Sequence, residues 1–186
     1  MHTPDYYLQH VKGWLSQEQA WLLFNLARNS FGHVVDIGTY HGLSALIMGS
    51  AIKNDPHRCV YTIDDYSSTG VNGISFSSKD MLAAYRNLAD ADACNVRMLT
   101  VSSQAAWELF GAALLTSPGL IFIDGSHTYE DVFEDVHAWS SIMARGSTIA
   151  CHDYELEGVK KAVDEFLAEE GKTDVKHCGN MIYWTK

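Results

Sequence analysis

The chain has 186 residues, of which 47% are hydrophobic and 19% are charged, and its formal net charge is −10 at pH 7. A length and composition of this kind predict one compact domain rather than a disordered chain. The negative charge, without any stretch rich in Lys or Arg, disfavours nucleic acid as a partner. No apolar run approaches the roughly 20 residues that span a bilayer, so we expect no membrane association. The four cysteines lack CxxC spacing and no signal peptide is visible, so we expect a cytoplasmic location.

Helical and extended patterns alternate along the chain. Residues 1–30 predict an amino-terminal helical segment, in which Ser16 and Gln19 have the spacing of a capping box. Beyond it, short apolar runs bounded by turn residues predict strands, and apolar residues at helical spacing predict helices. The predicted strands cover 33–37, 60–63, 96–101, 120–124, 147–151, 175–177 and 181–185. The predicted helices between them cover 42–52, 79–89, 104–115, 128–143 and 158–169.

This alternation predicts an α/β fold with a doubly wound, mostly parallel sheet of seven strands, because strands joined through helices pair in parallel. The last two strands are joined around Gly179 and Asn180, a connection short enough for an antiparallel hairpin. No linker or repeat interrupts the pattern, so residues 1–186 are predicted to form a single domain. Residues 67–78 are rich in Ser and Gly, and they are either an active-site loop or an insertion without a role.

The helix predicted over 128–143 has an apolar stripe and an acidic stripe. The apolar residues fall at helical spacing and predict a face packed in the core; they are Tyr129, Val132, Phe133, Val136 and Met143. The acids are predicted to form a solvated face, which suits the first turns of a helix; they are Glu130, Asp131, Glu134 and Asp135.

Acids and imidazoles follow two of the predicted strands. Asp124 and His127 come at the end of one apolar run, and His152 and Asp153 follow another. Because ligands bind beyond the carboxyl ends of parallel strands, these four side chains are predicted to meet at one edge of the sheet. Two carboxylates about 4 Å apart repel by roughly 4 kcal/mol at an effective dielectric near 20, and a cation or proton removes that cost. We therefore expect a metal or acid–base site, unless the acids cap backbone amides and the histidines form local hydrogen bonds.

The first predicted strand leads into a glycine-containing loop. Gly38 and Gly42 have GxxxG spacing instead of the GxGxxG spacing typical of dinucleotide binding. The helix beginning near Ser44 offers free amides to an anion or carboxylate. Asp36 precedes the loop, and Asp64 ends the second strand, where an acid can accept ribose hydroxyls. Together these features predict an adenosyl ligand without phosphates, such as S-adenosylmethionine.

Four segments resemble the class I S-adenosylmethionine-dependent methyltransferases, which have a Rossmann-like sheet. They are VVDIGTYHGLS (34–44), YTIDDY (61–66), IFIDGSHTYEDVFEDV (121–136) and IACHDY (149–154). The chain is most similar to the branch with an IDGxHxY signature and an HDY or DDY motif. That branch includes O-methyltransferases acting on antibiotic sugars and relatives described as cephalosporin hydroxylases.

The resemblance implies a set of site residues. The implied cofactor contacts are Asp36, Gly38, Tyr40, Gly42, Ser44, Asp64, Asp65, Ser103, Gln104 and Asp124. A divalent cation, Mg²⁺ or Mn²⁺, would be bound by Asp124, His152 and Asp153. Several relatives have acids where this chain has His152 and Ser126, and the second of these acids serves as the general base. The implied catalytic residues here are therefore His127, His152 and Asp153, with proton transfer assigned to one of the two histidines.

The resulting prediction is cation-assisted O-methylation of a small molecule by S-adenosylmethionine. One alternative is a metal-dependent oxygenase on the same scaffold, which would need His127 to join the site and complete a set of two histidines and a carboxylate. Another is a module that binds the cofactor without catalysis. The chain is short for this family and lacks a long amino-terminal lid, so we also expect a homodimer.

Overall fold

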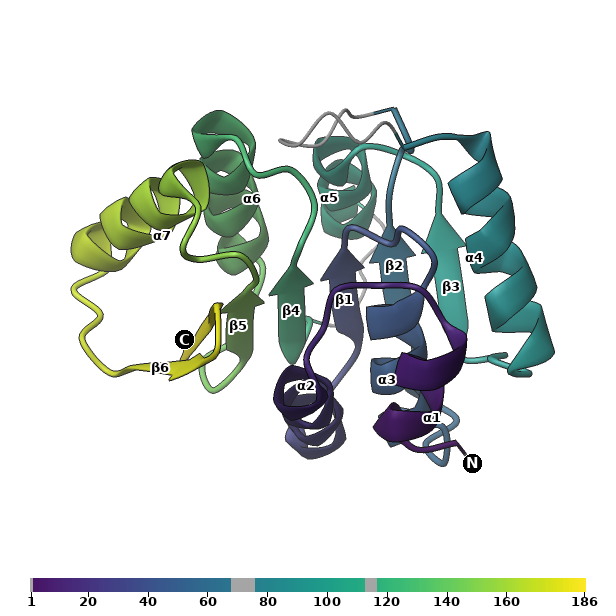
Figure 1. Cartoon of the computed structure of the whole chain (residues 1–186). Helices are drawn as coiled ribbons and strands as arrows, with labels where there is room; N and C mark the ends of the chain where they lie inside the picture. Colours follow the sequence, from purple (N-terminus) through teal and green to yellow (C-terminus); the bar gives the residue numbers. More distant parts are fainter. Residues whose placement is uncertain (1, 68–75, 113–116) are drawn as a thin grey trace.

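A seven-stranded sheet forms the centre of the protein, with helices on both faces (Figure 1). The computed structural model describes residues 2–67, 76–112 and 117–186, so most of the predicted loop over 67–78 lies outside the described residues. The strands lie in the order β3-β2-β1-β4-β5-β7-β6. Strands β1 to β5 pair in parallel, whereas β7 is antiparallel to both β5 and β6. The predicted fold, including its carboxyl-terminal hairpin, is confirmed.

The strands are short, and the parallel ones share one register. Their bounds are β1 (Val34–Ile37), β2 (Val60–Ile63), β3 (Val96–Leu99), β4 (Leu120–Ile123), β5 (Thr148–Cys151), β6 (Val175–Cys178) and β7 (Met181–Thr185). The last residues of β1, β2, β4 and β5 lie side by side. The next residue of each strand therefore emerges in the same row at the carboxyl edge, the upper edge of the sheet in Figure 1. These residues are Gly38, Asp64, Asp124 and His152.

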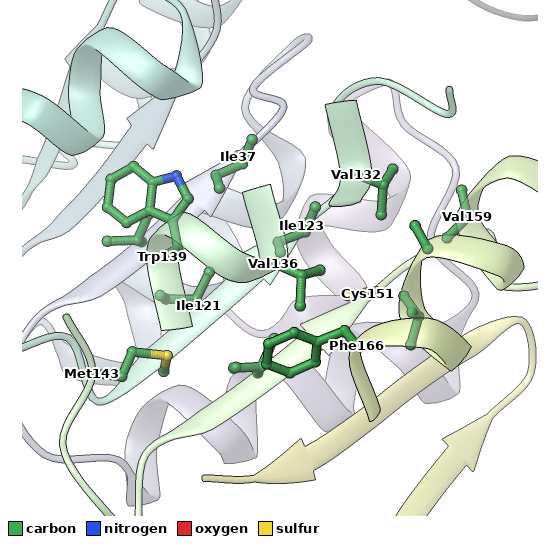
Figure 2. Packing of buried hydrophobic residues seen from close by; sticks show 14 of the residues in the cluster. Ile37, Ile121, Ile123, Val132, Val136, Trp139, Met143, Cys151, Val159 and Phe166 are labelled. Carbon is green, nitrogen blue, oxygen red and sulfur yellow. The ribbon is translucent and has the colours of Figure 1, made fainter. Parts of the chain in front are cut away.

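Alternation along the strands divides the core into two layers. In Figure 2, Ile37, Ile121 and Ile123 point to the face covered by α5 (Ser103–Ala112), α6 (Tyr129–Ser141) and α7 (Glu157–Glu169). The intervening residues Leu120 and Phe122 pack on the opposite face. That face is covered by α1 (Pro4–His10), α2 (Gln17–Asn29) and α3 (Leu43–Ile52), with α4 (Ser78–Asp90) at one side.

The observed elements lie close to the predicted ones. The capping box at Ser16 and Gln19 is present, with both reciprocal hydrogen bonds formed. β3 ends at Leu99, two residues before the predicted end, and α5 is described only to Ala112 because residues 113–116 lie outside the described ranges. Within the described ranges, no helix combines the length and apolar character needed to cross a bilayer.

Candidate functional site

A cavity of about 600 Å³ opens at the carboxyl edge of the sheet. This volume lies within the roughly 300–1,000 Å³ that is typical of small-molecule sites. One part of its wall is the loop after β1, and another is the group of acids and imidazoles after β4 and β5. Residues 12–15 and Asn180 contribute further lining from both ends of the chain. The cavity thus joins the two halves of the predicted site.

Gly38 is required by close packing against β4. Its φ of 96° lies in the left-handed region, and a Cβ at this position would lie 2.0 Å from the carbonyl oxygen of Asp124. Only glycine combines this backbone conformation with so close an approach. The glycine loop and the Asp124 turn are therefore held against each other by their main chains, and Gly38 also lines the cavity.

Asp64 orders the glycine loop. Its Oδ2 accepts hydrogen bonds from the backbone N–H groups of Thr39 (2.9 Å) and Tyr40 (3.0 Å), and its Oδ1 accepts from the N–H of Tyr66 (2.8 Å). Tyr40 has a φ of 46°, an unfavourable conformation for a tyrosine that these contacts help to hold. Burial raises the pKa of Asp64 despite the three hydrogen bonds. The side chain lines the cavity, and its predicted contact with ribose hydroxyls stays a prediction.

Asp36 lies behind the cavity wall rather than on it. Its Oδ2 accepts hydrogen bonds from Ser44 Oγ (3.1 Å) and Thr62 Oγ1 (2.7 Å), and its side chain is fully buried. Burial raises the pKa of Asp36 to about 7. Neither Asp36 nor Gly42 is among the lining residues, whereas Ser44 is. Asp36 therefore contacts the cavity wall through its hydrogen bond with Ser44.

Asp65, Ser103 and Gln104 line the cavity, and their contact with the cofactor stays a prediction. Asp135 also lines the cavity and was not predicted as a site residue. The solvated position expected for Asp135 is wrong, because its side chain is only 5% exposed. Helix α6 packs against both α5 and α7, so its buried face is wider than the apolar stripe indicates. Burial raises the pKa of Asp135 to about 7, with a hydrogen bond from Ser103 opposing the shift.

Asp124, His127, His152 and Asp153, here called the acid–imidazole cluster, converge on one point. His152 Nδ1 lies 3.3 Å from Asp124 Oδ1 and 3.2 Å from Asp153 Oδ2. His127 Nε2 lies 2.9 Å from Asp153 Oδ2 and 3.9 Å from Asp124 Oδ1. The structure thus brings together all four residues that the sequence placed at this edge. Ligand atoms of Asp124, His152 and Asp153 all lie within 4.8 Å of one another, close enough for one cation.

The cluster is strongly coupled electrostatically. Contact with Asp124 and Asp153 raises the pKa of His127 to about 9. Burial is the largest effect on His152 and opposes its protonation, but the same two carboxylates outweigh burial and raise its pKa to about 10. Burial alone would raise the pKa of Asp153. Contacts with the imidazoles of His127 and His152 outweigh burial and hold the pKa of Asp153 well below its ordinary value. The cluster can therefore hold positive charge, either as protons on the rings or as a metal ion bound to them.

Asn180, in the turn between β6 and β7, supports the cluster and was not predicted as a site residue. Its Nδ2 donates to Asp153 Oδ1 (2.7 Å) and to Glu155 Oε1 (2.9 Å), and its Oδ1 accepts from Gln19 Nε2 (2.5 Å). Asp153 has a φ of 53°, a strained conformation that is often found at functional sites. A Gly-Asn pair in a hairpin indicates only a turn, so this contact could not be predicted from the sequence.

The segment before α2 contributes an aromatic wall. Trp14 stacks on Tyr40, with ring centroids 4.6 Å apart, and Lys12 Nζ lies 5.3 Å from the Tyr40 ring centroid. Phe76 meets the same ring edge-on at 5.6 Å. All four side chains line the cavity. Trp14 is 56% exposed.

Comparisons with known proteins agree with this architecture. A family model described as a methyltransferase domain matches residues 35–154. The structure of the O-methyltransferase NovP has a TM-score of 0.75 at 16% identity, covering 91% of this chain and 79% of that chain. The O-methyltransferase TomG from Streptomyces achromogenes, involved in tomaymycin synthesis and solved with SAM, has a TM-score of 0.72 at 17% identity, covering 93% and 82%. An O-methyltransferase from Bacillus cereus in complex with SAH has a TM-score of 0.73 at 15% identity, covering 98% and 90%. None of the curated proteins is a significant match.

Proposed function

The chain belongs to the methyltransferase-domain family, since the family match over residues 35–154 spans more than half of it, and from this premise we propose its function. The protein transfers a methyl group from S-adenosylmethionine to a hydroxyl group of a small molecule, with the help of a divalent cation. The fold it shares with O-methyltransferases solved with SAM or SAH supports this proposal.

One observation carries the proposal: the glycine loop and the acid–imidazole cluster line the same cavity. The loop side offers an ordered backbone at Gly38 and Tyr40, the carboxylate of Asp65 and the hydroxyl of Ser103, which suit an adenosyl amino acid. The cluster side offers two carboxylates and two imidazoles, which suit a cation. Because Gly38 packs directly on the Asp124 main chain, the two sides are held at a fixed separation.

Each group has a distinct task. The cofactor supplies a methyl group on a sulfonium, and a bound divalent cation lowers the pKa of a hydroxyl group in contact with it. Asp124 and Asp153 balance the charge of the cation, and His152 adds a neutral donor. The hydroxyl proton passes either to His127 or to water in the cavity. A neutral imidazole has one free lone pair, so His127 cannot both accept this proton and bind the cation.

The test is calorimetric titration of the purified protein with S-adenosylhomocysteine, followed by the same titration of Asp124→Asn and Asp153→Asn. We expect micromolar binding to the unmodified protein and unchanged binding to both variants, because the acids serve the cation rather than the cofactor. Both variants should lose methyl transfer to any hydroxylated acceptor that the unmodified protein accepts. Absence of S-adenosylhomocysteine binding to the unmodified protein would overturn the proposal.

An oxygenase is the second candidate, because His127 does join the cluster, as that alternative required. Two imidazoles with a carboxylate are the usual ligands of non-haem Fe²⁺ oxygenases. The family match and the glycine loop favour methyl transfer. Consumption of oxygen with Fe²⁺ and a 2-oxo acid, without binding of S-adenosylhomocysteine, would reverse this preference. A non-catalytic module would bind the cofactor and leave every hydroxylated acceptor unmodified.

The predicted homodimer and cytoplasmic location stay part of the proposal. Light scattering at micromolar concentration tests the homodimer, and a measured mass of one chain would contradict it. Fractionation of cells that express the tagged chain tests the second.

A further inference from the structure

One part of the cavity wall combines apolar residues with a buried acid. Ile37, Ile63 and Val101 line the cavity and pack in or against the core layer covered by α5 and α6. Asp135, on α6, lines the same cavity with only 5% of its side chain exposed. A buried carboxylate is costly unless hydrogen-bond donors meet it. The position of Asp135 therefore calls for a ligand that brings a donor into this part of the cavity.

A chain of hydrogen bonds fixes which atoms of this wall can donate. Trp139, a core residue labelled in Figure 2, donates a hydrogen bond from Nε1 to Ser103 Oγ (2.7 Å). The Ser103 hydroxyl has a single proton, and it donates this proton to Asp135. Neither Ser103 nor an ionised Asp135 then has a donor left. Both side chains offer only acceptor lone pairs to a ligand.

Asp135 is not occupied by the structural role that its position would allow. An acid near the start of a helix can cap the first backbone amides. Among the described contacts of α5, however, Ser102 is the cap, because its Oγ accepts from the backbone N–H of Ala105 (3.2 Å). The neighbouring Gln104 donates from Nε2 to Glu134 Oε2 (3.1 Å). The carboxylate of Asp135 is thus the buried acceptor that these two helices leave for a ligand.

The place of this wall in the sheet suits the base of an adenosyl ligand. The glycine loop follows β1 and Ser103 follows β3, and these two strands are separated by β2. Neighbouring strands lie about 4.8 Å apart, so the ends of β1 and β3 are about 10 Å apart. Asp64, at the end of β2, lines the cavity between them. A ligand with its amino acid part at the glycine loop and its ribose at Asp64 would bring its base to Ser103 and Asp135.

Adenine has the chemistry that this wall lacks. Its ring is flat, with faces that pack on apolar side chains, and its exocyclic 6-amino group carries two N–H donors. We propose that Asp135 accepts a hydrogen bond from the 6-amino group of S-adenosylmethionine and makes the site selective for adenine over a 6-oxo purine. The inference rests on the proposed function, because it names the residue that recognises the base of the proposed cofactor.

The experiment compares two ligands that differ at this one group. Calorimetry near pH 8 measures binding of S-adenosylhomocysteine and of S-inosylhomocysteine, in which an oxo group replaces the 6-amino group. We expect the unmodified protein to bind S-adenosylhomocysteine roughly 10- to 100-fold more tightly, because the oxo group would place one acceptor against another. Equal affinity for the two ligands would overturn the inference.

Asp135→Asn should change the preference between the two ligands. The Asn amide can accept from Ser103 through its oxygen and present its NH₂ group to an oxo group. We expect about a 10-fold or greater loss of affinity for S-adenosylhomocysteine and a gain of affinity for S-inosylhomocysteine. A gain for one ligand cannot come from a damaged fold. An unchanged preference, or loss of both ligands, would show that Asp135 does not recognise the base.

Asp131→Asn is the matched control. Asp131 is on the same helix and lines the same cavity, and the substitution removes the same charge. Its side chain is exposed, and its Oδ2 accepts a hydrogen bond from Thr128 Oγ1 (2.8 Å). This variant should keep the preference of the unmodified protein. If Asp131→Asn and Asp135→Asn shift the preference equally, the effect is one of overall charge and the inference fails.

The same titrations separate this inference from the proposed function. If S-adenosylhomocysteine does not bind to the unmodified protein, the proposed function falls. If it binds but no more tightly than S-inosylhomocysteine, the proposed function stands and only the role of Asp135 falls.

Discussion

Asn180 Nδ2 donates a 2.7 Å hydrogen bond to Asp153 Oδ1, which leaves Asp153 Oδ2 facing both imidazoles of the acid–imidazole cluster. The hairpin turn thus sets which carboxylate oxygen faces the cluster. Gln19 Nε2 in turn donates a hydrogen bond to Asn180 Oδ1. The first turn of α2 and the turn between β6 and β7 therefore both help to position Asp153. Asn180 acts through Asp153 and is therefore a positioning residue.

We expect Asn180→Ala to weaken Mn²⁺ binding by about 10-fold, the lower end of the range seen when such supporting hydrogen bonds to metal ligands are removed. Calorimetry with Mn²⁺ measures the loss, and thermal unfolding of the metal-free protein shows whether the fold is intact. Lys176→Ala, an exposed change in β6 of the same hairpin, is the control and should bind Mn²⁺ normally. Normal Mn²⁺ affinity in Asn180→Ala would show that Asp153 needs no support from the turn.

The position of the cluster could be predicted from the sequence because parallel strands end at one edge. Asp124 and His152 each follow the last residue of a strand, and β4 and β5 are neighbours in register. The supporting contacts could not be predicted in the same way. Gln19 and Asn180 are 161 residues apart, and neither a capping box nor a Gly-Asn turn indicates a partner so distant.

Asp135 shows a second limit of sequence patterns. The spacing of apolar residues predicts which face of a helix packs on the sheet. It does not predict which other helices pack against the remaining faces. Packing of α6 against both α5 and α7 buries Asp135 beside Ser103, whereas Glu130 and Asp131 stay exposed. Asp131 and Asp135 of the acidic stripe both line the cavity, but only Asp135 is buried.

Gly38→Ala should destabilise the protein strongly. The new Cβ would lie 2.0 Å from the Asp124 carbonyl oxygen, so either the glycine loop or the β4 end must move. We expect a loss of about 3 kcal/mol or more in the free energy of unfolding, measured by urea denaturation. Gly171→Ala is matched in backbone conformation, with a φ of 62°, but nothing lies within 4 Å of its Cβ. It should cost only about 1 kcal/mol, and equal losses in both variants would show that packing against Asp124 adds nothing.

Asp135 should make the folded state less stable as pH rises. Its pKa is about 7 in the folded protein and 3.8 in the reference state, so between these values the folded protein binds more protons than the unfolded chain. The contribution of this group is therefore fully present below about pH 4 and is lost as pH rises through about 7. Asp135→Asn resembles the protonated acid and should remove this part of the pH dependence.

Urea denaturation near pH 5 and near pH 7 measures the effect. Relative to the unmodified protein, Asp135→Asn should gain stability between the two conditions by up to a few kcal/mol, since one pKa unit corresponds to about 1.4 kcal/mol. Glu130→Gln, on the exposed side of the same helix, should leave the pH dependence unchanged. A pH dependence as steep in Asp135→Asn as in the unmodified protein would show that Asp135 is not the source.

Trp14→Ala should weaken cofactor binding without weakening the fold. Trp14 is 56% exposed, so its removal costs little in unfolding free energy, but it stacks on Tyr40, whose backbone belongs to the glycine loop. A stacked aromatic pair contributes about 1 kcal/mol, which corresponds to roughly a fivefold loss of S-adenosylhomocysteine affinity. Calorimetry measures this loss, and Leu109→Ala, a comparably exposed apolar residue on α5 that does not line the cavity, is the control. If both variants bind S-adenosylhomocysteine as tightly as the unmodified protein, the stacked pair of Trp14 and Tyr40 is not part of the cofactor site.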